Sequence, residues 1–120
     1  MKRSTRVRGY DVMNVWSTST SFLGYAYYPT DDKHRLATDG IVIQYGSVPG
    51  GPIENYNEGK TLTHEAGHWF GLAHTFQGGC TPTNDGVNDT PAQSSPASGC
   101  PEGRDSCDLP GLDPIRNYMD

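Results

Sequence analysis

Three histidines and one glutamate between residues 64 and 74 have the residue types and spacing of a metal site. The segment is His64-Glu65-Ala66-Gly67-His68-Trp69-Phe70-Gly71-Leu72-Ala73-His74. On a helix, His64 and His68 lie on one face with their Cβ atoms roughly 5–6 Å apart, so both imidazoles can reach one zinc ion. Gly71 lets the chain turn sharply out of the helix, because glycine accepts positive φ, and the turn brings back His74 as a third ligand.

Glu65 follows the first histidine and points to a neighbouring side of the same helix, where it is not a ligand. Three protein ligands leave a fourth position open, which is typical of a catalytic zinc site. A zinc ion held in this way activates water and polarises a carbonyl group. Glu65 is the predicted general base, which takes a proton from water and passes it to the leaving amine. The pattern therefore predicts one zinc ion and peptide hydrolysis without a covalent intermediate.

Length and composition limit the other classes of function. The chain has 120 residues, 15 glycines, 9 prolines and a formal charge of −5, which suits one loop-rich domain and argues against a nucleic-acid partner. No stretch approaches about 18 consecutive apolar residues, so we expect neither a transmembrane helix nor a membrane partner. The basic N-terminal residues look like a solvated end, and no apolar segment of a signal peptide follows them.

The predicted elements are three strands and one long helix, with the helix expected to pack onto the sheet. Strands are expected over residues 10–16, 22–28 and 40–45, and the helix over residues 61–70. The strand over residues 40–45 is either an edge strand that holds an extended peptide or an ordinary core strand. Thr61 is the expected N-cap, and the residues expected to pack the helix onto the sheet are Leu62, Ala66, Trp69 and Phe70.

Two polar regions lie outside these elements. The charged loop over residues 30–39 contains Asp31, Asp32 and His34, and we expect this histidine to be solvated. After His74 the regular periodicity disappears, and residues 77–114 are rich in Gly, Pro, Asn, Asp and Ser. Because so long a loop is unusual without a clamp, disulfides and bound calcium are expected there. The domain over residues 1–120 thus divides into sheet and zinc helix over about 1–76 and clamped loops over about 77–120.

Many segments of the chain resemble the pappalysin-type metzincins, and above all their secreted fungal and bacterial branch. They begin with Tyr10–Trp16, Leu23–Ala26 and Asp39–Tyr45, and continue with the zinc motif and His74–Cys80. The others are Asp85–Pro91, Ser94–Pro101, Gly111–Pro114 and Asn117–Asp120. The resemblance implies a secreted, monomeric zinc metalloendopeptidase that acts on peptides or proteins. It also implies an α+β, zincin-type catalytic domain with a mixed, twisted sheet over the active-site helix, and the loop-rich C-terminal part would here end at the Met-turn.

The resemblance also implies roles for individual residues. Met119 would form the hydrophobic floor beneath the zinc, and the strand over residues 40–45 would form the upper rim of the cleft. Cys80 would pair with Cys107, while Cys100 would pair with a cysteine that relatives carry after the Met-turn. Asp85, Val87 and Thr90 would bind calcium, for which carboxylate, carbonyl and hydroxyl oxygens are suitable ligands. A plain turn at Asp85-Gly86 is the alternative to this calcium site.

Departures from the family pattern leave other functions open. Relatives begin earlier, and they carry a tyrosine two residues after the Met-turn methionine, so we expect this chain to be truncated at both ends. The main alternative is therefore a zinc-binding fragment of such a protease without catalytic turnover. A third hypothesis is a calcium-stabilised extracellular binding module in which the histidines are incidental, and it predicts no stoichiometric zinc.

Overall fold

A computed structural model describes residues 1–29 and 33–120, which form two compact units, Met1–Gly71 and Leu72–Asp120. Unit 1 contains every regular element of the described residues. Its helices are α1 (Lys2–Thr5) and α2 (Lys60–Trp69), its strands are β1 (Val15–Thr18), β2 (Gly24–Ala26) and β3 (Ile41–Gln44), and its 3-10 segments are η1 (Lys33–Ala37) and η2 (Tyr45–Ser47). The predicted loop residues Asp31 and Asp32 lie outside the described residues.

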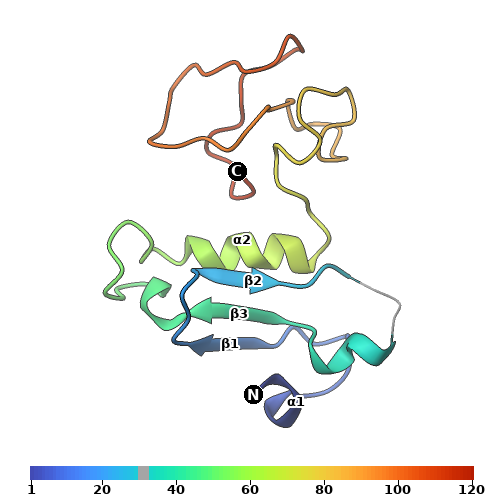
Figure 1. The fold of residues 1–120 in the computed structure, drawn as a ribbon, viewed down its shortest axis with the longest axis vertical. Coiled ribbons are helices and arrows are strands. Elements are labelled where there is room, and N and C mark those ends of the chain that lie inside the picture. The colour runs from blue at the N-terminus through green and yellow to red at the C-terminus, as the bar shows by residue number, and fades with distance from the viewer. Residues whose placement is uncertain (30–32) are drawn as a thin grey trace. The chain divides into compact units, whose positions relative to one another are not determined.

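The sheet of unit 1 has the strand order β1-β3-β2, with β1 parallel and β2 antiparallel to β3 (Figure 1). The central strand contributes Ile41, Val42 and Ile43, which are 0, 3 and 5% exposed. Such a continuous apolar run suits a strand that is buried on both faces. Of the two alternatives for this strand, the core strand is therefore confirmed and the edge strand is wrong, because β1 and β2 occupy its two sides. The upper-rim role that the resemblance implies for it does not fit this central position.

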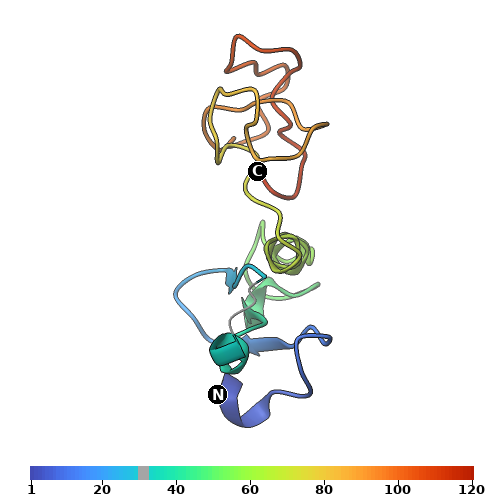
Figure 2. The same ribbon diagram turned by 90° about the vertical axis from the view of Figure 1, so that its right-hand side faces the viewer.

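The helix α2 runs beside β2 on one face of the sheet, as the two views in Figures 1 and 2 agree. The side chains of α2 that are buried belong to Thr61, Glu65 and His68. The prediction that Phe70 packs onto the sheet is wrong, because Phe70 is 69% exposed. The helix therefore turns its polar, functional face inward, and a hydrophobic stripe is a poor guide to its orientation.

Two elements begin at residues other than those predicted from the sequence. The first strand begins at Val15, and the side chain of the preceding Asn14 bonds to the backbone of Val7 and Val12. The helix begins at Lys60 after Gly59, which has φ of 83° and takes the N-cap position predicted for Thr61.

The basic N-terminus is not a solvated end. Lys2 donates hydrogen bonds from Nζ to the carbonyl oxygens of Thr38 and Gly40 at 2.7 and 3.0 Å. Arg6 forms an ion pair with Asp39 at 2.7 Å, and both side chains are under 10% exposed. The charges of this segment therefore hold it against the loop that leads into β3.

Unit 2, all of whose residues the structure describes, has neither helix nor strand. The implied disulfide between Cys80 and Cys107 is present and closes a loop with a sequence separation of 27, while Cys100 is free and exposed. Polar and apolar residues are equally frequent among the buried residues of this unit, whereas apolar residues dominate a normal core. The buried residues of the unit are Thr75, Ala92, Gln93, Cys107, Asp113 and Met119.

Candidate metal centre

Two of the predicted ligands, His64 and His68, project from adjacent turns of α2 toward a common point. Their Nε2 atoms lie 3.1 Å apart, and their rings meet edge to face with centroids 4.7 Å apart. His68 is 8% exposed, so the pair is formed at the inward side of the helix. This is the arrangement that the four-residue spacing predicts, because residues i and i+4 share one helix face.

The third predicted ligand follows the end of the helix. Gly71 has φ of 95°, the left-handed conformation predicted for the turn, and its N–H donates to the carbonyl oxygen of His68 at 2.9 Å. The ring of His74 stacks on that of Phe76 with centroids 4.9 Å apart. The candidate ligand atoms of His64, His68 and His74 all lie within 4.8 Å of one another.

The chemistry of this donor set fits zinc. Three imidazole nitrogens suit a borderline-soft divalent ion, and three protein ligands leave one coordination position for water or substrate. The fourth histidine, His34, lies on η1 and is exposed, as expected from the sequence. The three histidines of the motif are therefore the residues that could hold the metal.

Glu65 is placed by the edge strand β2. Its side chain is buried, with the residue 7% exposed, and its carboxylate accepts a hydrogen bond from the backbone N–H of Ala26. Burial raises the pKa of Glu65, while the electrostatic interaction with the nearby His64 and the hydrogen bond from Ala26 act in the opposite direction. A carboxyl group with a raised pKa and a fixed orientation is suited to accept and return a proton.

Gly24 makes room for this carboxylate. A Cβ atom at this position would lie 2.8 Å from Cγ and 2.9 Å from Oε1 of Glu65, which is closer than such atoms approach. Sequence reasoning missed both Gly24 and Ala26 as site residues. A glycine inside a strand pattern is nevertheless a signal for close backbone approach, and Gly24 interrupts an aromatic strand.

Two further residues at the site were also missed. The ring of Tyr28 meets that of His68 edge to face at a centroid distance of 5.4 Å. The indole Nε1 of Trp69, next to His68, donates to Oδ1 of Asp39 at 3.0 Å. The carboxylate that pairs with Arg6 therefore also fixes the last turn of the zinc helix.

The residues of the predicted calcium site share one pocket of about 230 Å³ within unit 2. Asp85 accepts the N–H of Val87 at Oδ1 at 3.0 Å, and the carbonyl oxygen of Val87 accepts the N–H of Thr90 at 3.2 Å. Asp89 and Asn117 also line the pocket. These bonds also fit the alternative of a plain turn, so the geometry alone does not assign a cation.

Met119 of the predicted Met-turn is 6% exposed, and its carbonyl oxygen accepts the N–H of Thr75 at 3.0 Å. The side chain is thus buried within unit 2, and the backbone of Met119 is bonded directly to Thr75, the residue that follows His74. Its role as a floor beneath the metal stays a prediction.

Within the described residues, no helix has the length and apolar character that crossing a membrane requires.

The chain is similar in sequence to a known peptidase family and to extracellular metalloproteases of fungi. The family model described as pregnancy-associated plasma protein-A, peptidase M43, matches residues 8–120. An extracellular metalloprotease of Colletotrichum graminicola is 55% identical over the whole chain, which spans 45% of that relative. Extracellular metalloprotease 1 of Coccidioides posadasii is 54% identical, with the same shares covered. The chain thus spans less than half the length of these curated relatives.

Solved structures agree with the sequence match. A structure of mirolysin in complex with a compound named "compound 9" superposes with a TM-score of 0.75 at 32% identity, and the match covers 90% of this chain and 43% of that mirolysin chain. Mature mirolysin of Tannerella forsythia in complex with a cleaved peptide gives a TM-score of 0.67 at 33% identity, with the same coverage. The α+β fold predicted from the sequence is therefore confirmed as that of this group of proteases.

Proposed function

Since the chain belongs to the M43 peptidase family, described as pregnancy-associated plasma protein-A, we propose that it is the zinc-binding part of a secreted metalloendopeptidase. The observation that carries the proposal is the convergence of three histidine ligand atoms within 4.8 Å, next to the buried Glu65. The extracellular metalloproteases among its relatives support secretion and a peptide or protein substrate. A monomeric state is part of the same proposal.

In this mechanism the chain's own residues hold the metal and move one proton. His64, His68 and His74 would hold zinc, which supplies electrophilic activation of the water and of the peptide carbonyl when bound. The Glu65 carboxylate accepts the proton that water loses as its oxygen attacks the carbonyl carbon. It then delivers that proton to the amide nitrogen as the carbon–nitrogen bond breaks. The Ala26 N–H keeps the carboxylate in one orientation during both transfers.

The substrate would lie along β2 rather than along β3. Among the described strands, β2 pairs on one side with β3, and its other side is an edge of the sheet. An edge strand can bind an extended peptide through main-chain hydrogen bonds. This edge is also the strand that contacts α2 and positions Glu65. We therefore assign to β2 the rim that the sequence suggested for the strand over residues 40–45.

A second candidate function is zinc binding without turnover. The observation that favours it is that the chain corresponds to 45% of the length of its relatives, so residues that serve catalysis in a relative can lie outside the matched part. This candidate uses the same three histidines. It differs from the first in predicting stoichiometric zinc and no cleavage of an unfolded protein.

Calcium is the second cation of the proposal, with Asp85, Val87 and Thr90 as its ligands. The support is that oxygen-bearing residues of the expected kinds line one pocket within unit 2. Calorimetric titration with calcium should show one site that Asp85→Asn weakens. Titration without heat or stabilisation would favour the plain turn.

The experiment that tests the main proposal compares Glu65→Gln with the unaltered chain. Purified chain should contain one zinc and cleave a denatured protein in a chelator-sensitive manner. Glu65→Gln should keep the zinc and lower the rate by about 10²–10⁴-fold, the usual contribution of a general base. Glu58→Gln, which changes an exposed glutamate just before α2, is the matched control and should leave the rate unchanged. Full activity in Glu65→Gln would exclude this residue as the base.

A further inference from the structure

Thr75, the residue after His74, has all of its polar groups paired within unit 2. It is 0% exposed, and its N–H donates to the carbonyl oxygen of Met119 at 3.0 Å. Its hydroxyl donates to Oε1 of Gln93 at 2.7 Å, and its carbonyl oxygen accepts from Nδ2 of Asn84 at 2.7 Å. The backbone that carries the third predicted ligand is therefore fixed by three bonds at one buried residue.

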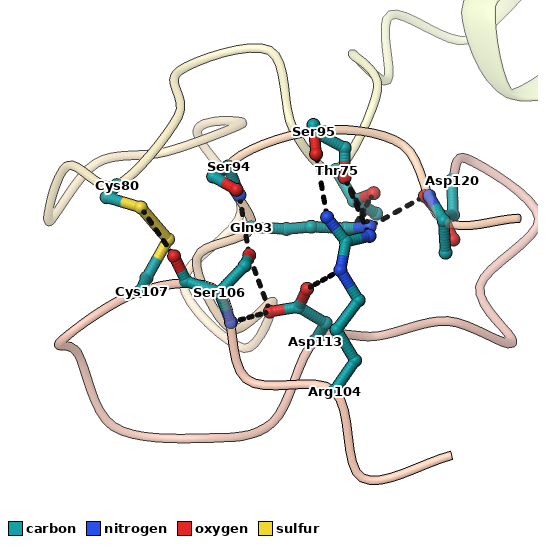
Figure 3. Close-up of polar contacts among 11 residues, drawn as sticks. Thr75, Cys80, Gln93, Ser94, Ser95, Arg104, Ser106, Cys107, Asp113 and Asp120 are labelled. Atoms are coloured by element: carbon teal, nitrogen blue, oxygen red, sulfur yellow. Dashed lines mark hydrogen bonds and ion pairs between the residues drawn. A yellow bond between two sulfur atoms is a disulfide. The ribbon is translucent and has the colours of Figure 1, made fainter. Parts of the chain in front are cut away.

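Gln93 connects this residue to the Met-turn (Figure 3). Its amide is 0% exposed, and its Nε2 donates to Oδ1 of Asp120 at 2.8 Å and to the carbonyl oxygen of Ser95 at 3.0 Å. The same Asp120 oxygen accepts the N–H of Ala97 at 2.9 Å. The side-chain amide of Gln93 thus bridges Thr75, which follows His74, and Asp120, which follows Met119.

The surrounding contacts hold Gln93 itself in place. Ser94 donates its N–H to Oγ of Ser106, which precedes the disulfide residue Cys107, at 3.0 Å. The guanidinium of Arg104 donates to the carbonyl oxygen and to Oγ of Ser95 at 3.0 and 2.7 Å, as Figure 3 shows. The disulfide and the arginine therefore fix the segment on the C-terminal side of the amide.

We infer that Gln93 is a positioning residue that holds His74 and the Met-turn in their metal-binding arrangement. The inference rests on the proposed zinc site. His64 and His68 are set by the backbone of a helix, but His74 lies in a unit without regular structure, so side-chain bonds must supply the same order. Residues that hydrogen-bond a metal ligand typically change metal affinity about 10–100-fold when they are lost, and Gln93, which acts through the neighbouring Thr75, should fall near the lower end of that range.

A charge swap between Gln93 and Asp120 tests this inference in the 120-residue chain. Gln93→Glu keeps an acceptor for Thr75 but places a carboxylate against the Asp120 carboxylate, and we expect zinc affinity to fall about 10-fold or more. Asp120→Asn alone keeps an acceptor for both of its donors and should change affinity little. The double variant Gln93→Glu/Asp120→Asn restores a donor–acceptor pair between the two side chains but not the bond to the carbonyl oxygen of Ser95, so it should recover part of the affinity.

The measurement is the zinc dissociation constant from competition with a chelator, together with the visible spectrum of the Co²⁺-substituted chain. His74→Ala gives the reference for loss of the third ligand, and Gln93→Glu should shift both readouts toward it. Glu102→Gln, in an exposed ion pair with Arg116, should leave both unchanged. If Gln93→Glu fails to fold, Thr75→Val and Thr75→Ser replace it, and the valine variant alone should weaken zinc binding.

The outcomes separate this inference from the proposed function. An unaltered chain that binds no zinc would overturn the zinc site and the role of Gln93 with it. A chain that binds zinc normally, with no change in affinity or Co²⁺ spectrum in Gln93→Glu or Thr75→Val, would overturn the role of Gln93 alone. A lower melting temperature with unchanged zinc affinity would show that the amide is merely structural.

Discussion

The two units of this chain hold metal-binding residues by different physical means. Unit 1 places His64, Glu65 and His68 on a helix that packs beside a sheet, and the first three residues of the central strand of this sheet are apolar and buried. Unit 2 carries His74 in a chain without helix or strand, stabilised by a disulfide and by buried polar side chains. Backbone hydrogen bonds order the first, whereas specific side chains order the second. Unit 2 should therefore be the more sensitive to changes of single side-chain groups.

Each unit nevertheless has one buried carboxylate paired with an arginine, and these pairs allow the sharpest comparison. Asp39 lies 2.7 Å from Arg6, whose side chain is 6% exposed, and also accepts from Trp69. Asp113 lies 3.0 Å from Arg104, whose side chain is 22% exposed. Removing one member of a buried pair is costly because the other charge stays buried without compensation.

We expect Asp39→Ala to lower the free energy of unfolding by about 3–5 kcal/mol, the range for breaking a buried ion pair. Asp113→Ala also removes the acceptor of the Ser106 N–H and hydroxyl, but Arg104 keeps its two bonds to Ser95 and is more exposed, so we expect a smaller loss. Amide hydrogen exchange of both variants measures the loss in each unit, because both tryptophans, Trp16 and Trp69, lie in unit 1. Equal losses would mean that solvent exposure of the arginine does not determine the cost.

Loss of the disulfide should affect unit 2 alone. For a loop of 27 residues the chain-entropy estimate is about 3–4 kcal/mol, so Cys80→Ala/Cys107→Ala should destabilise unit 2 by roughly that amount. Amide hydrogen exchange should then show lost protection at Thr75 and Asn84 and retained protection at Val42 and Ile43. Cys100→Ala, which removes the free exposed thiol, is the control. Simultaneous loss of protection in β3 would show that the units unfold together.

The sequence predicted the parts of the molecule that depend on short spacing. The four-residue interval of His64 and His68, the left-handed turn at Gly71 and the buried β-branched strand are local properties, and the structure contains all three. The disulfide and the overall fold came from the resemblance to a family. The resemblance also gave Asp85 as a calcium ligand, and that role is still a proposal.

The features that sequence reasoning missed depend on contacts between residues far apart in the chain, and the spacing of apolar residues carries no information about such contacts. The apolar residues of α2 suggested the wrong inward face, because Glu65 and His68 are needed there for the site. Edge and core stayed open for the strand over residues 40–45, because its position depends on pairing with β1 and β2, which are only four and three residues long. Gln93 was not singled out at all, since a single amide in a polar loop has no pattern that marks it as buried.

Gly24 offers a change that should separate proton transfer from metal binding within unit 1. A methyl group in Gly24→Ala would meet Glu65 at 2.8 Å, so the carboxylate must move while the histidines keep their places. We expect turnover to fall about 10- to 100-fold, since displacing a reacting group by about 1 Å can cost that much. Zinc content and KM should change little, and steady-state kinetics with metal analysis measures all three quantities.

Thr61 provides the control for this change, because its Cγ2 would lie 3.1 Å from the same methyl group. Adding Thr61→Ser to Gly24→Ala removes that second contact and leaves the contact with Glu65. If the double variant stays as slow as Gly24→Ala, displacement of the base explains the loss. Recovery of turnover would instead assign the effect to crowding against Thr61, and the edge strand would then position the helix rather than the base.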